Sequence, residues 1–145
     1  MSKGRLVEFA LGVLDRAAKW LPQREAAHLT TGRVGEEAAY FYLRKLGYMM
    51  VARNWRTVSR RGELDMVGWD GATLCFIEVK TRGMRSVVPA EMSVDSAKRE
   101  ELREMAKEYS RQMPSGTKKR FDVVSVYFDD GKPDVQLMKD AFGWN

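Results

Sequence analysis

The feature that most constrains this chain is a mostly apolar run at residues 73–81 that also carries two charged side chains. Apolar runs of this length, bounded by turn signals, are typical of a strand inside a sheet. Because side chains alternate between the two faces of a strand, Glu78 and Lys80 project from the same face. An unpaired charge in a sheet core costs several kcal/mol or changes its pKa, so this face needs partners. A salt bridge near a strand end is the simplest explanation for an isolated pair of this kind.

The residues before this run supply candidate partners for its charges. Residues 63–69 form a second predicted strand, and the Asp-Gly pair that follows is a strong signal for a hairpin turn. Glu63 and Asp65 share one face of that strand, and the hairpin would bring them beside Glu78. Carboxylates at close range repel one another and favour a cation. Ligation by oxygen alone selects a hard divalent ion, so Mg²⁺ is expected, with Mn²⁺ as its usual substitute.

Composition narrows the chemistry that this chain can perform. The chain has 145 residues, the size of one domain, and a formal charge of +5 that weakly favours polyanionic partners. Its one cysteine, Cys75, excludes an internal disulfide and a cysteine zinc site. Its one histidine, His28, lies in a predicted linker, which argues against a serine–histidine–aspartate triad and against metal ligation by several histidines. This cysteine usage fits a reducing cytoplasm. Any catalysis must therefore rest on carboxylates, lysines, arginines and hydroxyls.

The first part of the chain predicts an amphipathic helix that is separate from the acidic strands. Apolar residues recur at helical spacing over residues 3–21, and Pro22 ends the pattern. Residues 22–30 are predicted as a linker, which divides the chain into an N-terminal segment at 1–29 and a domain at 30–145. The apolar face of this helix could pack on its own domain, form a dimer contact or attach to a membrane surface. The segment is too short and too charged for a transmembrane span.

A second helix is predicted from residue 30 or 31, where a threonine can cap it, to residue 46, where Gly47 follows. At the rotation of an ideal helix, Glu36 lies at the edge of the apolar face and can reach a site over the sheet. Glu37 lies on the opposite, polar face and is expected to pair with Arg33. This helix therefore adds one acid, Glu36, to the candidate cluster.

The remaining elements complete an α/β pattern. Further strands are predicted at residues 48–58, 120–128 and 134–138, and a helix is predicted from residue 93 or 95 to about residue 113. Lys98 lies on the inward side of that helix, where a lysine in the first turn opposes the helix dipole. It is expected to face an acid or a phosphate, with a solvated surface position as the alternative. The element order predicts a central mixed sheet flanked by helices.

Basic residues surround the predicted acidic cluster. They bracket the first hairpin, follow the strand of Lys80 and lead into the strand at 120–128: Arg53, Arg56, Arg60, Arg61, Arg82, Arg85, Lys118, Lys119 and Arg120. Together they are suited to neutralise nucleic-acid phosphates, although each one alone is ordinarily a solvated charge. Trp55 among them is expected in the core, with base stacking as the alternative. Arg120 and Asp122 share a strand face and are expected to form a structural pair.

Several sequence blocks, in order along residues 31–140, resemble a known family. The blocks are Gly35-Glu36, Gly47-Tyr48, Arg53-Asn54-Trp55-Arg56, Gly62-Glu63-Leu64-Asp65, Phe76-Ile77-Glu78-Val79-Lys80-Thr81-Arg82 and Arg120-Phe121-Asp122-Val123-Val124. Together they resemble the YraN-like family of predicted bacterial endonucleases. That family is similar to archaeal Holliday junction resolvases within the PD-(D/E)xK superfamily. The resemblance implies a restriction-endonuclease-like α/β core in α-β-β-β-α-β order and Mg²⁺-dependent hydrolysis of phosphodiester bonds.

The resemblance also implies roles for individual residues. Glu36, Asp65 and Glu78 would ligate the metal ion, and Lys80 would complete the catalytic set. Glu63 would either support these ligands from behind or pair with an arginine. The loop arginines have no strict counterpart in that superfamily, whereas Lys98 matches a helix position that often carries a polar helper. From their charge and position, the residues expected to contact nucleic acid are Arg53, Arg56, Arg60, Arg61, Arg82 and Lys98.

The partner implied by the resemblance is nucleic acid, DNA rather than RNA, with branched DNA as one candidate substrate. Cutting both strands of a junction needs two active sites, so a homodimer is compatible with this function. The alternative is a nucleic-acid-binding module or an interaction protein that has no turnover.

Overall fold

The computed structural model describes residues 23–82, 94–129 and 132–145, with side chains described from residue 32 onward. Its elements, in chain order, are α2 (Gln23–Lys45), β1 (Met49–Trp55), β2 (Leu64–Asp70), β3 (Thr73–Arg82), α3 (Ser96–Ser110), β4 (Lys118–Asp129) and β5 (Lys132–Phe142). The helix predicted at 3–21 and the rim residue Arg85 lie outside the described residues. In the described parts of the chain, no helix is long and apolar enough to cross a membrane.

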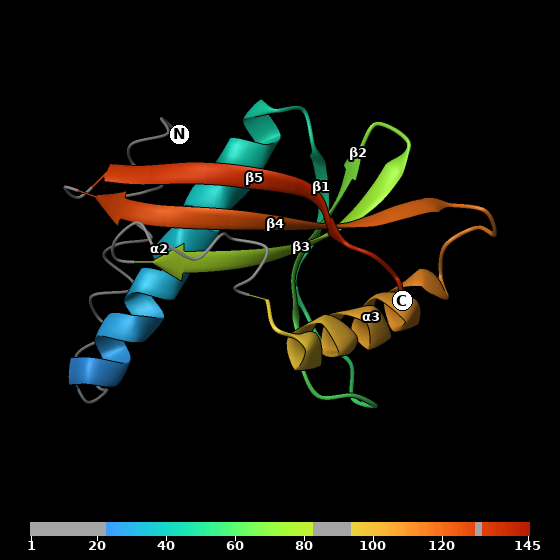
Figure 1. Cartoon of the computed structure of the whole chain (residues 1–145), viewed down its shortest axis with the longest axis horizontal. Helices are drawn as coiled ribbons and strands as arrows, with labels where there is room; N and C mark the ends of the chain where they lie inside the picture. The colour runs from blue at the N-terminus through green and yellow to red at the C-terminus, as the bar shows by residue number, and fades with distance from the viewer. Residues whose placement is uncertain (1–22, 83–93, 130–131) are drawn as a thin grey trace. The chain divides into compact units, whose positions relative to one another are not determined.

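The five strands form one mixed sheet in the order β1-β2-β3-β4-β5 (Figure 1). The β3–β4 pair is parallel, and the other three neighbouring pairs are antiparallel. The predicted hairpin between β2 and β3 is confirmed, because Asp70 pairs with Thr73. Gly71 in this turn has a φ of +59°, which glycine adopts without strain. The acidic strand β3 is therefore central, as its apolar composition predicts.

Each face of the sheet has its own apolar core. On one face, Phe76 of β3 and Phe121 of β4 pack with buried residues of α3, among them Met105. On the other face, Ile77 of β3 packs with Leu43, which belongs to the Gly35–Lys45 part of α2. The architecture is α/β, with a five-stranded mixed sheet and two helices, and it is consistent with a restriction-endonuclease-like core.

One of the two helices begins where the sequence predicts, and the other does not. α3 follows the predicted cap, because the Asp95 side chain accepts a hydrogen bond from the Lys98 backbone N–H at 2.8 Å. α2 instead begins at Gln23, so the start predicted at residue 30 or 31 and the linker predicted at 22–30 are wrong. Residues 23–27, Gln-Arg-Glu-Ala-Ala, favour helix strongly, and no glycine or proline lies between them and the predicted start at residue 30 or 31. The division at 1–29 and 30–145 stays a prediction.

β1 and β5 are the two strands whose lengths differ most from the prediction. β1 ends at Trp55 rather than at residue 58, after Asn54 takes a left-handed conformation with a φ of +48°. β5 is longer than the predicted 134–138, because it follows β4 as far as the pair Phe121–Phe142. The extent of both strands depends on their pairing with neighbouring strands, and a local sequence pattern carries no information on that pairing.

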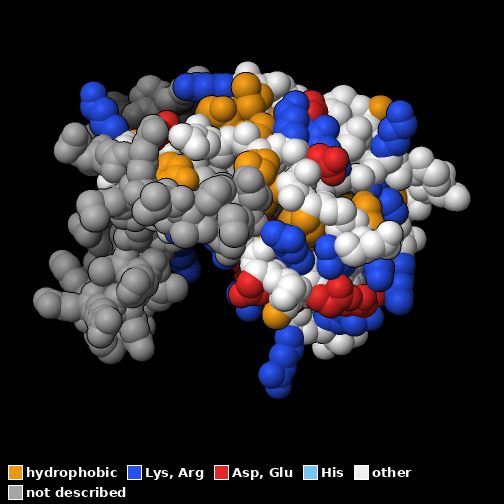
Figure 2. Space-filling model, in the orientation of Figure 1, with side chains coloured by type: hydrophobic (Ala, Val, Ile, Leu, Met, Phe, Trp, Pro, Cys, Tyr) orange, Lys and Arg blue, Asp and Glu red, His pale blue; other side chains and the backbone are white. Residues whose placement is uncertain are grey.

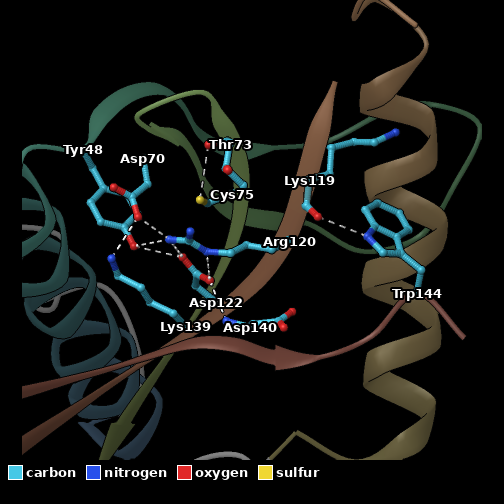
Figure 3. A network of polar contacts seen from close by, with 10 residues as sticks. All are labelled: Tyr48, Asp70, Thr73, Cys75, Lys119, Arg120, Asp122, Lys139, Asp140 and Trp144. Atoms are coloured by element: carbon cyan, nitrogen blue, oxygen red, sulfur yellow. Dashed lines mark hydrogen bonds and ion pairs between the residues drawn. The ribbon is translucent and has the colours of Figure 1, made fainter. Parts of the chain in front are cut away.

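A buried polar network lies around Arg120 of β4 (Figure 3). Its guanidinium donates to Asp122 at 2.8 Å and to Asp70 at 2.6 Å. Asp122 is completely buried and also accepts hydrogen bonds from the Tyr48 hydroxyl, at 3.0 Å, and from the Asp140 backbone N–H, at 3.0 Å. The network joins β2, β4, β5 and the residue that precedes β1. The predicted structural pair of Arg120 and Asp122 is thus confirmed as the centre of a larger, well-satisfied group.

We expect Asp122→Asn to destabilise the protein by about 3 kcal/mol, because it removes the charge of a completely buried carboxylate that accepts hydrogen bonds from Arg120 and Tyr48. Urea unfolding monitored by circular dichroism measures this loss. Glu100→Gln is the matched control, since its side chain is 61% exposed and its ion pair with Arg103 lies on the surface of α3. A cost for Asp122→Asn that is no larger than that of the control would contradict a stabilising role for the network.

Candidate metal centre

The sheet register places two candidate acids, and an asparagine beside them, in one row across three strands. The pairing of Met66 with Ile77 places Asp65 of β2 opposite Glu78 of β3. On the other side of β2, Asp65 lies opposite Asn54, because the flanking positions of β1 and β2 are paired. The predicted convergence of Asp65 and Glu78 is therefore present in the structure.

Asp65 and Glu78 form a neighbouring acid pair, in which Glu78 is buried and Asp65 is half-buried. The Asp65 carboxylate accepts a hydrogen bond from the Val79 backbone N–H at 2.9 Å. Burial, together with the neighbouring charge of Glu78, raises the pKa of Asp65 from 3.8 to about 7. Burial also raises the pKa of Glu78, which is only 5% exposed, against the opposing effect of two lysines. Two acids held in this way are poised to exchange a proton for a cation.

Lys80 and Lys98 both approach the same oxygen of Glu78. The Lys80 Nζ lies 3.5 Å from Glu78 Oε1, and the Lys98 Nζ lies 3.9 Å from it. Lys98 also pairs with Glu101 at 3.1 Å, one turn further along α3. The inward direction predicted for Lys98 is confirmed. The other oxygen, Glu78 Oε2, is buried and receives no N–H or hydroxyl donor, while a hydrogen bond with the Asp65 carboxyl lowers the pKa of Glu78.

Glu36 and Glu63 extend this pair into a larger acidic group. One carboxylate oxygen from each of Glu36, Glu63 and Asp65 lies within 4.8 Å of the others. Burial raises the pKa of Glu36, and the charges of Asp65 and Glu63 raise it further, while a hydrogen bond from Asn54 lowers it. Glu63, whose role the sequence left open, both joins this group and pairs with Arg56. Asp65 is shared by the two halves of the cluster.

Gly35 explains how α2 delivers Glu36 to this place. A Cβ atom at Gly35 would overlap the Thr81 side chain of β3, so the helix can approach the strand this closely only with glycine. Glu36 is the next residue in the chain. In the Gly35-Glu36 pair, the glycine allows α2 to pack closely on β3, and this close packing places the Glu36 carboxylate at the acidic group.

Asn54 is the site residue that sequence reasoning missed. Its side-chain Nδ2 donates to Glu63 Oε1 at 2.9 Å and to Glu36 Oε2 at 3.3 Å. The period-two pattern of a strand gives no sign of this, because the left-handed conformation of Asn54 departs from it. The available signal was its residue type, since asparagine enters the left-handed region more readily than other non-glycine residues.

Four of the predicted nucleic-acid contacts are engaged by acids: Arg53, Arg56, Arg60 and Lys98. Arg53 pairs with Glu37 at 2.9 Å and lies over the Tyr40 ring at 4.3 Å. The pairing predicted between Glu37 and Arg33 is therefore replaced by a contact from α2 to β1, which local helical spacing cannot reveal. Arg56 pairs with Glu63, and Lys98 pairs with Glu101.

The other rim residues divide between exposed and packed positions. Arg60 pairs with Glu104 of α3 at 3.2 Å, whereas Arg61 is exposed. Trp55 packs on the α3 side of the sheet, where it meets Tyr109 edge-on at 5.2 Å. The core position expected for Trp55 is confirmed. Around α3 itself, acidic and basic side chains alternate on the outer surface (Figure 2).

Unsatisfied buried polar atoms concentrate beside the acid pair. Among the described residues, such atoms belong to Glu78, Arg82 and Ser125. Strand alternation and the pairing of Lys80 with Ser125 place all three on one face of the sheet. Buried polar groups ordinarily have partners, so this region differs from the rest of the sheet. Its oxygen atoms suit a hard cation, and its nitrogen and hydroxyl donors suit an anion.

We expect Asp65→Asn to stabilise the metal-free protein at pH 8 by roughly 1–3 kcal/mol. Because the pKa of Asp65 is raised from 3.8 to about 7 on folding, folding becomes less favourable as pH rises through this window, and asparagine removes that cost. Thermal unfolding with a chelator measures the difference at pH 8 and at pH 4, where it should largely vanish. A variant less stable than the parent at pH 8, with Glu100→Gln unchanged, would show that Asp65 does not carry this strain.

Comparison with known proteins identifies the family of this chain. The model of the uncharacterised protein family UPF0102 matches residues 35–126. A family member from Koribacter versatilis (strain Ellin345) is 54% identical over 118 residues, which is 81% of this chain and 82% of the relative. Another from Solibacter usitatus is 43% identical, over 91% of this chain and 99% of the relative. One from Pseudomonas aeruginosa (strain LESB58) is 39% identical, over 77% and 90%. The chain therefore belongs to the uncharacterised protein family UPF0102.

Proposed function

We propose that this protein is a metal-dependent nuclease that hydrolyses phosphodiester bonds in nucleic acid. One observation supports this most strongly: Asp65 and Glu78 meet across two central strands, and Lys80 lies 3.5 Å from Glu78. Two acids and a lysine from one sheet face are the groups that metal-assisted hydrolysis requires. A structural salt bridge does not require a second buried acid beside the first.

The chemistry of the acids fits a hard divalent cation. Asp65, Glu78 and Glu36 would hold Mg²⁺ or Mn²⁺, with Glu63 beside them, since all four offer only oxygen. Burial raises the pKa of Asp65 and Glu36, and repulsion from neighbouring acids raises it further; a cation would relieve that repulsion. When bound, it supplies a water of lowered pKa and neutralises charge on the phosphate.

The lysines would divide the remaining tasks. Lys80, with its side chain 31% exposed, can donate to an attacking water or to a phosphate oxygen from beside Glu78. Lys98 is held by Glu101 and approaches Glu78 from α3, so it would keep the Glu78 carboxylate oriented. The raised pKa of Lys98 keeps it charged at neutral pH, because Glu78 and Glu101 outweigh the effect of its burial.

The substrate proposal rests on charge around the site. Arg61 is exposed, and the Arg56 side chain is 75% exposed although it pairs with Glu63. Arg82 lies two residues beyond Lys80 on the same strand face and retains an unpaired Nε. These groups can contact phosphates on either side of the cleaved bond. The family resemblance favours DNA, including branched DNA, and two copies acting together on a junction.

The test is cleavage of labelled duplex, single-stranded, flapped and four-way DNA, with matched RNA, in Mg²⁺ or Mn²⁺. Glu78→Gln and Lys80→Ala should each lower the cleavage rate at least about 100-fold. Lys107→Ala is the matched control, because this lysine is 57% exposed on α3 and pairs only with its neighbour Glu104.

Two outcomes would contradict a nuclease. One is the absence of cleavage on every substrate together with no heat of metal binding in calorimetry. The other is salt-dependent nucleic-acid binding that neither a chelator nor Glu78→Gln alters, which would indicate a binding module without turnover.

A further inference from the structure

We infer that Asn54 is a positioning residue, which uses its side-chain amide to hold Glu36 and Glu63 together as ligands of the acidic centre. This inference rests on the proposed function and extends it to a residue outside the acid–lysine set. Asn54 contributes no charge and no carboxylate. Its contribution lies in the geometry of two acids that come from different elements.

The backbone of Asn54 is shaped for this contact. At a φ of +48°, Asn54 leaves the extended conformation near the end of β1, directly opposite Asp65 in the sheet register. In an ordinary strand, the side chain at this position would point along the normal of the sheet. The left-handed conformation turns it instead toward Glu36 of α2 and Glu63, which immediately precedes β2.

The amide is matched to the two carboxylates that it contacts. An asparagine NH₂ group has two hydrogens, and the two contacts, at 2.9 Å to Glu63 Oε1 and 3.3 Å to Glu36 Oε2, use both of them. Arg56 holds the second oxygen of Glu63 at 2.7 Å. The hydrogen bond from Asn54 also lowers the pKa of Glu36, which opposes the effects of burial and of the neighbouring acids. Asn54 and Arg56 therefore fix the Glu63 carboxylate from both oxygens, and the same Asn54 amide ties it to Glu36.

The adjacent acid pair indicates independently that this centre receives a ligand. Glu78 is 5% exposed and lies against Asp65, and its buried Oε2 receives no N–H or hydroxyl donor, so a proton shared with Asp65 or a bound cation is what can satisfy this carboxylate. Asp65 in turn lies within 4.8 Å of the two acids that Asn54 holds. Asn54 of β1, Asp65 of β2 and Glu78 of β3 therefore lie side by side in one row across the sheet.

Substitutions at position 54 can distinguish the role of the side-chain amide from the role of the left-handed backbone. Glycine adopts the left-handed conformation freely but lacks the amide, whereas alanine lacks the amide and is strained there. Asp140 is the other non-glycine residue with a positive φ among the described residues, at +53°. It lies in the Arg120 network, where its backbone N–H and not its side chain contacts Asp122. Asp140→Gly is therefore a matched control for the exchange of a left-handed residue for glycine.

The experiment measures Mn²⁺ affinity of the full chain by electron paramagnetic resonance, without substrate, for the parent protein, Asn54→Gly, Asn54→Ala and Asp140→Gly. Both Asn54 variants should bind Mn²⁺ about 10–100-fold more weakly than the parent. Asn54→Gly should keep the urea midpoint of the parent, while Asn54→Ala should lower it. Asp140→Gly should leave Mn²⁺ affinity unchanged.

Each remaining outcome is decisive. If the parent binds Mn²⁺ and Asn54→Gly binds it equally well, Asn54 has only a backbone role and the inference is overturned while the nuclease proposal stands. Equal weakening by Asp140→Gly would also overturn it, because the effect would then be general. If the parent binds no Mn²⁺, the metal centre fails and the role of Asn54 fails with it.

Discussion

The burial of the Glu78 carboxylate in the middle of the sheet is the constraint on which the site depends. A charge there is tolerated only with partners, and the fold brings them from three directions. Lys80 shares its strand, Lys98 comes from α3, and Asp65 comes from the neighbouring strand β2. These partners do not satisfy it fully, since one oxygen receives no N–H or hydroxyl donor, and burial together with the charge of Glu78 raises the pKa of Asp65. The arrangement is costly for a fold alone and reasonable for a centre that receives a cation.

The Arg120 network shows what the same sheet does when a buried charge has only a structural role. Asp122 is as deeply buried as Glu78, yet it receives hydrogen bonds from a guanidinium, a phenol and a backbone N–H. Its network lies toward the other end of β2 and β3, where the strands turn at Asp70 (Figure 3). The two ends of the sheet therefore differ. At one end the buried polar groups have hydrogen-bond partners and stabilise the fold, and at the other end neighbouring carboxylates repel one another.

The sequence predicts those parts of the structure that depend on local pattern. The apolar run around Glu78, the Asp-Gly turn and the alternation of Asp65 within β2 predict a central strand, a hairpin and two facing acids. Helical phase likewise distinguishes Glu36, which reaches the acidic group, from Glu37, which does not join it. These features follow from periods of 2 and 3.6 residues, which are properties of the chain itself.

Other parts depend on contacts between distant residues and could not be predicted in this way. The pairing of Arg53 with Glu37 requires knowing that β1 passes beside α2. The left-handed conformation of Asn54 breaks the alternation that reveals strands, so its two hydrogen bonds are invisible in sequence. The start of α2 at Gln23 reflects helix propensity continuing through residues where a threonine cap offered a competing start. Family membership does not supply these details either, because UPF0102 is uncharacterised.

The central claim is that Asp65 and Glu78 share a divalent cation, and anomalous diffraction from crystals soaked in Mn²⁺ tests it most directly. The account predicts one strong peak within about 2–2.6 Å of oxygens from both side chains, with Glu36 or Glu63 completing the ligands. A map with no peak at this place, at Mn²⁺ concentrations that saturate the protein in solution, would contradict the account.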